Sequence, residues 1–175
     1  ALSRRVPEYV ARSKAVRALE EAREKGEVAD EVKAVLDKVG GCACKTTIGS
    51  CVFANKPGDG SAREQAASCQ KVLGGFANIC YEFATKRYRS NCINWGILPF
   101  TLDEGTPFDY DNGDCVFVPG IRSAIENGVE DIPAKVIRKD GNVEDILLHV
   151  KGLTADEKAI ILDGCLMNYY ANRAE

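Results

Sequence analysis

The sequence has little of what marks several protein classes. It holds one histidine, one tryptophan and one methionine among 175 residues. No apolar run approaches the roughly 20 residues that a membrane-spanning helix needs, and the first residues are polar and charged, unlike a signal peptide. A net charge of −3 gives no reason to expect nucleic acid as the main partner. We therefore expect a cytoplasmic protein that does not contact membranes.

Eight cysteines are many for this length, yet no Cys-x-x-Cys pair, typical of zinc and iron–sulfur sites, occurs. Secreted disulfide frameworks are usually shorter and denser in cysteine. The one tight cluster is Cys42-Ala43-Cys44, where a metal site is a minor alternative. We expect small buried hydrophobic side chains at four cysteines within apolar or helical patterns: Cys69, Cys80, Cys92 and Cys165.

The N-terminal quarter is predicted to be a helical appendage, residues 1–46. Apolar spacing predicts helices over 7–25 and 29–39, with Pro7 at the first position of the first helix and a glycine after each end. The compact part of the domain is expected to be residues 47–175. No internal repeat or low-complexity tract interrupts it.

The compact part predicts an α/β domain with a mixed sheet. A strand, a crossover helix and a second strand form a parallel βαβ unit, which is normally right-handed. Asp140-Gly141 is a hairpin turn signal, and Thr154-x-x-Glu157 is a capping box. The expected elements are a strand at 47–54, a helix at 62–73, a strand at 76–80, a helix near 82–94, a short strand at 115–118, a hairpin at 133–150 and a helix from 154 to about 170. The sheet should start parallel and end antiparallel.

The stretch Pro-Gly-Asp-Gly-Ser-Ala-Arg-Glu, from Pro57, joins the first strand to its crossover helix. Helix N-termini at the carboxyl ends of parallel strands bind anions, because their first N–H groups are unpaired. Glycines let backbone amides approach a ligand, and Arg63 offers a planar fork for a carboxylate or phosphate. The simpler interpretation is a capping box, Ser61-x-x-Glu64, with Arg63 solvated. The stretch is neither a Walker A loop nor a dinucleotide fingerprint.

Residues 58–67, GDGSAREQAA, resemble the Gly-x-Gly-Ser-Ser-Arg-Glu-His-Ala signature of the aconitase superfamily. That signature lies in the swivelling C-terminal domain, a β/β/α fold that forms the small subunit of isopropylmalate isomerases. Further similar segments follow in the family's order: Leu73-Gly74-Gly75, Phe83-Ala84 and Asn91–Phe100. The resemblance covers about residues 47–170. Two positions depart from it, because Ala62 replaces a serine and Gln65 replaces the histidine.

The resemblance implies a hydro-lyase that removes and re-adds water on a small hydroxy-carboxylic acid. Ser61 would be the base that takes the proton next to a carboxylate, and Arg63 would bind a substrate carboxylate. Gly60 and Ala62 would border the substrate, and a further substrate arginine would be Arg4 or Arg5. The capping and catalytic interpretations agree here, since an N-cap oxygen that faces backbone N–H groups would have its alkoxide stabilised.

The resemblance also implies a 4Fe–4S cluster, held by three cysteines of another domain, whose open iron takes the leaving hydroxyl. This chain is expected to bind no cofactor, to supply half of an active site and to be inactive alone. Its partner would be the cluster-binding part of the same polypeptide, or a large subunit. The non-Met start and the helical appendage favour a fragment of a longer chain over the alternative of a separate small subunit.

A third alternative is a non-catalytic module that binds anions or RNA. It would use a basic cluster of Lys86, Arg87 and Arg89 with Tyr81 and Tyr88, for which a solvated face or a docking surface is the simpler interpretation. The single histidine, His149, lies on an expected strand far from the signature, and we expect it to be structural.

Overall fold

The computed structural model describes residues 2–174, and they form one six-stranded sheet in the order β1-β2-β3-β6-β5-β4. β1, β2 and β3 run parallel, whereas β6, β5 and β4 continue the sheet antiparallel. The strands are β1 Ser50–Ala54, β2 Gly75–Cys80, β3 Leu98–Thr101, β4 Cys115–Phe117, β5 Asp131–Ile137 and β6 Val143–His149. The expected parallel start and antiparallel end are confirmed.

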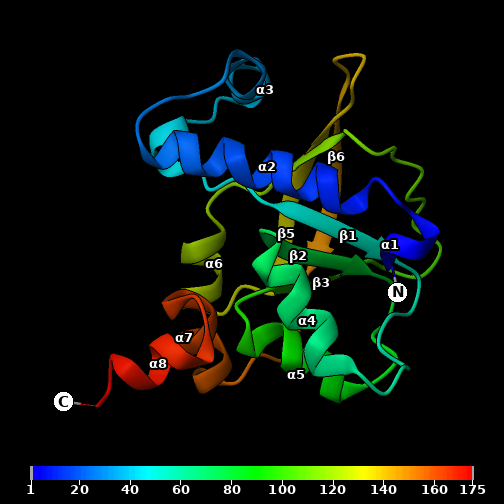
Figure 1. Cartoon of the computed structure of the whole chain (residues 1–175), viewed down its shortest axis with the longest axis vertical. Coiled ribbons are helices and arrows are strands. Elements are labelled where there is room, and N and C mark those ends of the chain that lie inside the picture. Colours follow the sequence, from blue (N-terminus) through cyan, green and yellow to red (C-terminus); the bar gives the residue numbers. More distant parts are fainter. Residues whose placement is uncertain (1, 175) are drawn as a thin grey trace.

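Helices α4 and α5 are the crossovers between the parallel strands. Because β1, β2 and β3 are neighbours in chain order, two right-handed crossovers lie on the same face, and α4 and α5 pack against each other there (Figure 1). The helices are α1 Leu2–Arg5, α2 Tyr9–Glu24, α3 Asp30–Val39, η1 Ala43–Lys45 (a 3₁₀ turn), α4 Arg63–Val72, α5 Lys86–Asn94, α6 Ile121–Asn127, α7 Ala155–Asp163 and α8 Leu166–Ala171. None of the helices in residues 2–174 has the length and apolar character to cross a membrane.

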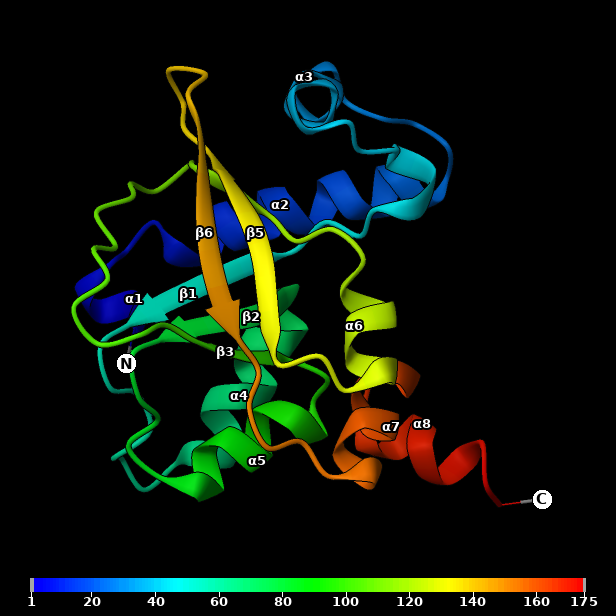
Figure 2. The ribbon, with the colours of Figure 1, turned by 180° about the vertical axis from the view of Figure 1, so that it is seen from behind.

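The main core follows the period-two pattern of the antiparallel strands. In β5 the side chains of Ile132, Ala134 and Val136 are buried, whereas Asp131 and Pro133 are exposed. Helix α3 is not part of this core: Figures 1 and 2 show it beyond α2, and its buried Leu36 lies with Phe117 of β4 around Gly41. The other residues of the core are Ile79, Phe100, Leu102, Ile125, Ile146, Leu148 and Val150.

The parallel and antiparallel halves meet at a narrow seam. β3 and β6 are in register through a single pair, Thr101 and His149. The His149 side chain is buried between two carboxylates, with Nδ1 2.7 Å from Oδ1 of Asp131 and Nε2 3.3 Å from Oδ2 of Asp103. This position, between the halves and outside the signature turn, favours the structural role expected for His149.

Several expected elements have different limits in the structure. The helix predicted over 154–170 is two helices, because the backbone turns at Gly164, whose φ is +93°. The first long helix begins at Tyr9, since Pro7 lies in the turn between α1 and α2. The helix predicted near 82–94 begins at Lys86, after the N-cap Thr85.

The cysteines expected to be buried divide into two groups. Cys80 and Cys92 are fully buried, as predicted, whereas Cys69 is exposed and Cys165 is partly buried, so the prediction is wrong for Cys69. Cys69 lies on the outer face of α4, where the helical pattern alone could not assign burial.

Candidate active site

The signature stretch forms the loop between β1 and α4, at the edge of the sheet where β1 and β2 end (Figure 1). In parallel α/β sheets this edge is the usual place for a ligand, because crossover helices point their N-termini at it. The signature loop therefore lies at the edge that strand and helix order predicted for it.

Gly58 fixes the shape of this loop. Its φ is +99°, and a Cβ there would approach the Cβ of Tyr88 to 2.5 Å. The carbonyl oxygen of Gly58 accepts hydrogen bonds from Thr85 Oγ1 at 3.1 Å and from Arg63 Nε at 2.9 Å. The loop is therefore fastened to the start of α5, and only glycine fits at this position.

A buried polar network lies behind the loop. Gln70 Nε2 donates to Asn78 Oδ1 at 2.7 Å, and Asn78 Nδ2 donates to Tyr88 Oη and to Cys92 Sγ, both at 3.3 Å. Burial raises the pKa of Tyr88 and raises the pKa of Cys92 to about 11, so both stay neutral at ordinary pH. Because buried polar groups with satisfied hydrogen bonds are held rigidly, the network gives the loop a firm support.

The predicted capping box at the signature does not form. Helix α4 begins at Arg63 with Ala62 as its N-cap, and no side chain caps it. Glu64 instead accepts hydrogen bonds from Asn91 Nδ2 and Trp95 Nε1 of the next crossover, so it cannot reach back to the residue before the helix. Ser61 is exposed and outside the helix. The expectation that its oxygen faces the helical N–H groups as an N-cap is wrong.

Arg63 is half-buried, and only some of its hydrogen-bond donors are used within the domain. Its Nε donates to the Gly58 oxygen at 2.9 Å, and its Nη2 donates to the Asp59 oxygen at 3.4 Å. Nη1 makes no hydrogen bond to another residue within 2–174. The bond from Nε orients the side chain. The end of the guanidinium that carries Nη1 and Nη2 can donate hydrogen bonds to a carboxylate.

The remaining predicted site residues make no side-chain hydrogen bond to another residue within 2–174. Gly60 and Ala62 are exposed, and a Cβ at Gly60 would meet open space, so the close approach that glycine allows is needed at Gly58 alone. Arg4 and Arg5 are exposed on α1, which Figure 1 places at the same edge of the sheet, and neither bonds to another described residue.

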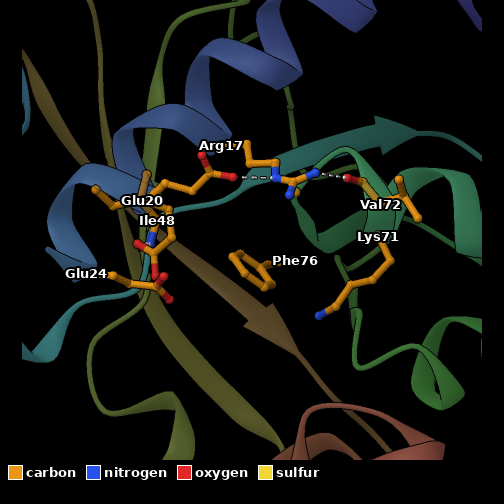
Figure 3. Close-up of a pocket in the computed structure, with 9 residues that line it drawn as sticks. Arg17, Glu20, Glu24, Ile48, Lys71, Val72 and Phe76 are labelled. Atoms are coloured by element: carbon orange, nitrogen blue, oxygen red, sulfur yellow. Dashed lines mark hydrogen bonds and ion pairs between the residues drawn. The ribbon is translucent and has the colours of Figure 1, made fainter.

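A hollow of about 470 Å³ lies at the other end of α4. Figure 3 shows Lys71 reaching into it, with Nζ 4.5 Å from the ring centre of Phe76, and burial lowers the pKa of this lysine. Its lining residues are Arg17, Glu20, Glu21, Glu24, Ile48, Lys71, Val72, Gly74 and Phe76. Ten helical residues separate the two ends of α4 by about 14 Å, so this hollow is distinct from the signature loop. The loop itself is an open surface.

Several side chains of the expected basic cluster are bound to other parts of the domain. Arg89 donates to the Lys151 oxygen at 2.8 Å and pairs with Glu157 at 3.4 Å, and Tyr88 is buried. Tyr81 Oη donates to the Thr106 oxygen at 2.6 Å. These contacts are internal, so the cluster does not present a stacking platform for nucleic-acid bases.

Sequence reasoning missed two features. Glu64, Asn91 and Trp95 join the two motifs of the resemblance, and their occurrence in both motifs was the available signal. Cys42 and Cys44 form a disulfide, which excludes them as paired metal ligands. Within residues 2–174 no three His, Cys, Asp or Glu side chains are placed to hold a metal, so these residues do not fit an iron–sulfur cluster.

Comparisons with known proteins show which family this chain resembles. The family model described as Aconitase C-terminal domain matches residues 9–105. Aconitate hydratase A of Bradyrhizobium diazoefficiens is 29% identical over 115 residues, 64% of this chain. The 3-isopropylmalate dehydratase small subunit of Metallosphaera sedula is 32% identical over 126 residues, which cover 71% of this chain and 67% of that protein.

One solved structure, a 3-isopropylmalate dehydratase from Methanocaldococcus jannaschii, matches 75% of this chain and 69% of its own at 26% identity, with a TM-score of 0.46. The chain spans only 12–15% of the length of the curated aconitate hydratases that it matches.

Proposed function

The chain belongs to the aconitase C-terminal domain family, and from this premise we propose that it is the swivelling domain of an aconitase-like hydro-lyase. In this proposal the domain supplies Ser61 and Arg63 to an active site that a cluster-binding part of the enzyme completes. The substrate is a small hydroxy-carboxylic acid. The observation that carries the proposal is the open signature loop. In this loop Ser61 is exposed and makes no side-chain hydrogen bond to another described residue, and Arg63 has Nη1 unbonded.

Arg63 is proposed to orient the substrate. Its Nε keeps the bond to the Gly58 oxygen, while Nη1 and Nη2 take the two oxygens of a carboxylate in a bidentate pair. The 3.4 Å bond from Nη2 to the Asp59 oxygen is long enough to be exchanged at little cost. Arg4 and Arg5 remain proposed contacts for a second carboxylate, and Gly60 and Ala62 are proposed to border the substrate.

Ser61 is proposed to move the proton. Its Oγ would take the proton from the carbon next to the bound carboxylate and return it in the reverse reaction. Ser61 is not the N-cap of α4, because Ala62 occupies that position. N-capping therefore cannot be what stabilises the serine alkoxide. The nearest positive groups on this chain are Arg63 and the first N–H groups of α4, and we propose that they stabilise the charge on the serine once partner domains exclude water.

The described residues, 2–174, do not fit an iron–sulfur cluster, so we propose that a cluster that takes part in this chemistry is held by the partner. We also propose the division into a helical segment, residues 1–46, and a core, residues 47–175. A cytoplasmic location stays a prediction. A separate small subunit is the second candidate, favoured by the 67% of the Metallosphaera sedula protein that the chain covers.

The test is reconstitution of activity from two parts. The chain is mixed anaerobically with its cluster-loaded partner domain, and the unsaturated acids formed from citrate or 3-isopropylmalate are followed by ultraviolet absorbance. Activity is expected only when both parts are present. Activity of the partner without this chain, or full activity of the mixture with Ser61→Ala and Arg63→Ala together, would contradict the proposal.

A further inference from the structure

The disulfide between Cys42 and Cys44 has no part in the proposed active site. It closes the 3₁₀ turn η1, in the connection between α3 and β1, and both residues are exposed. A single residue, Ala43, separates the two cysteines. The disulfide therefore lies on the surface of the described domain, where a small thiol can reach it.

This disulfide is poorly suited to be a structural staple. In the chain-entropy account a disulfide stabilises more as its loop grows longer, and this loop encloses only Ala43. The other six cysteines are free, and Cys69 is exposed, whereas burial raises the pKa of the Cys51 thiol to about 12 and also raises the pKa of the Cys115 thiol. A domain that depended on disulfides for its stability would not leave an exposed thiol unpaired. The Cys42–Cys44 disulfide is therefore better suited to thiol–disulfide exchange than to stabilising the fold.

The disulfide lies where the appendage is tied to the rest of the domain. The oxygen of Ala43, between the two cysteines, accepts a hydrogen bond from Arg23 Nη1 at 3.2 Å. Arg23 pairs with Glu20 at 2.7 Å, and Glu20 accepts the N–H of Ile48 at 2.8 Å. Helix α2 thus holds the segment that enters β1 at two points, one of them within the disulfide ring.

This contact has little solvent around it. The side chains of Glu20 and Arg23 are only 11% and 15% exposed. Burial raises the pKa of Glu20, but Arg23 and the Ile48 N–H together outweigh it, so the pKa lies below its ordinary value. Glu20 and Ile48 also line the hollow of Figure 3. A change in the turn at Ala43 is therefore transmitted to α2 and to this hollow.

We propose that Cys42–Cys44 is a thiol–disulfide exchange site, reduced by a low-molecular-weight thiol, whose redox state sets how firmly α3 and η1 are held against α2. A thiolate attacks one of the two sulfurs, the S–S bond breaks, and the other sulfur leaves as a thiolate and takes a proton. A second thiol attacks the mixed disulfide, releasing the reduced chain and one oxidised thiol dimer. Two electrons pass from the two thiols to the protein.

The first test is a redox titration of the whole chain in mixtures of reduced and oxidised glutathione. Free thiols are trapped by alkylation, and the peptide that contains Cys42 and Cys44 is identified by mass. We expect the reduced fraction of this peptide to follow the redox potential of the glutathione buffer as a two-electron couple does. The ratio of reduced to oxidised peptide should then change tenfold for about 30 mV. A pair that stays oxidised in reduced glutathione, or stays as two thiols in oxidised glutathione, overturns the proposal.

The second test is hydrogen exchange of the oxidised and reduced chains. Reduction should speed exchange of the Lys45, Thr46 and Ile48 amides about threefold to tenfold, the effect of losing one hydrogen bond. Cys42→Ser with Cys44→Ser should exchange at the fast rate in both buffers, and the control Cys69→Ser should respond like the wild type. Equal rates in both states, or a reduced pair that binds stoichiometric zinc and resists reoxidation, overturn the proposal.

Discussion

Two helices of this domain begin with the same sequence pattern and use it differently. At α7, Thr154-x-x-Glu157 forms a complete capping box: the Thr154 hydroxyl accepts the Glu157 N–H at 3.2 Å, and the Glu157 carboxylate accepts the Thr154 N–H at 2.9 Å. At α4, Ser61-x-x-Glu64 forms neither bond, because Glu64 is bound by Asn91 and Trp95.

The difference separates structural from functional use of a helix N-terminus. At the α7 terminus the capping box satisfies the N–H groups of Thr154 and Glu157. The α4 terminus is held in place from the side by Glu64, so its first N–H groups, Ser61 and part of Arg63 stay free. An unpaired helix start costs stability in a free domain, and a bound anion repays it.

Ser61→Ala should give the largest effect, in the enzyme completed by its partner. Loss of a general base lowers kcat by on the order of 10²–10⁴, with a smaller change in KM, because a base acts mainly in the transition state. Steady-state kinetics on the reconstituted enzyme measures this. Thr154→Ala is the matched control and should keep normal turnover. Equal kcat values for the two variants would erase the distinction between the two termini.

Gly58→Ala should cost the free domain about 2–4 kcal/mol of unfolding free energy, because alanine is strained at positive φ and its Cβ would collide with Tyr88. Urea unfolding measures the change. Gly60→Ala, three residues before the helix, should stay within about 0.5 kcal/mol, because its Cβ meets open space. A Gly58→Ala domain as stable as wild type would show that the loop is not fastened at this point.

Arg63→Lys should lower kcat/KM of the completed enzyme by a factor that corresponds to about 1.5–3 kcal/mol of lost transition-state stabilisation, the scale of a hydrogen bond to a charged group. The reason is that lysine keeps the charge but lacks the bidentate fork. The free domain should lose about 1 kcal/mol or less, since lysine forfeits the bond from Nε to the Gly58 oxygen. Kinetics and a urea titration of the same variant separate the two effects. Unchanged kcat/KM would remove Arg63 from the substrate contacts.

The smallest effect concerns stability of the two termini. Thr154→Ala should destabilise the domain by about 1 kcal/mol, the usual value of an N-cap side chain, whereas Ser61→Ala should stay within about 0.5 kcal/mol. Thr154→Ser, which keeps the capping oxygen, should stay near wild type. Thermal or urea unfolding of the three variants checks the order. A larger loss at Ser61 than at Thr154 would indicate that the serine caps its helix after all.

Local patterns predicted much of the fold. Glycines, turn signals and the crossover order predicted the unit of β1, α4 and β2 and the β5–β6 hairpin, but not strand β3, and the Thr154 capping box is confirmed. The identical pattern at Ser61 failed because its outcome depends on Asn91 and Trp95, which the fold brings to Glu64 from 27 and 31 residues away. Such competition between distant partners cannot be derived from a short sequence window.

The place of the candidate residues in the fold could be predicted, whereas their contacts could not. The sequence indicated Ser61 and Arg63 at a helix start, and both lie there. It could not show that Arg63 is half engaged with its own loop, nor that Cys42 and Cys44 pair with each other. Both features depend on side-chain rotamers and backbone turns that spacing alone does not determine.

The single-pair seam between β3 and β6 has a consequence for folding. The parallel strands lie within residues 50–101 and the antiparallel strands within 115–149, so each half-sheet is built from one continuous piece of chain. With one register pair between them, the halves share little backbone bonding and are joined mainly by the side chains of their common core. A ribosome delivers the signature half first, so its loop and crossovers can assemble before the hairpin exists.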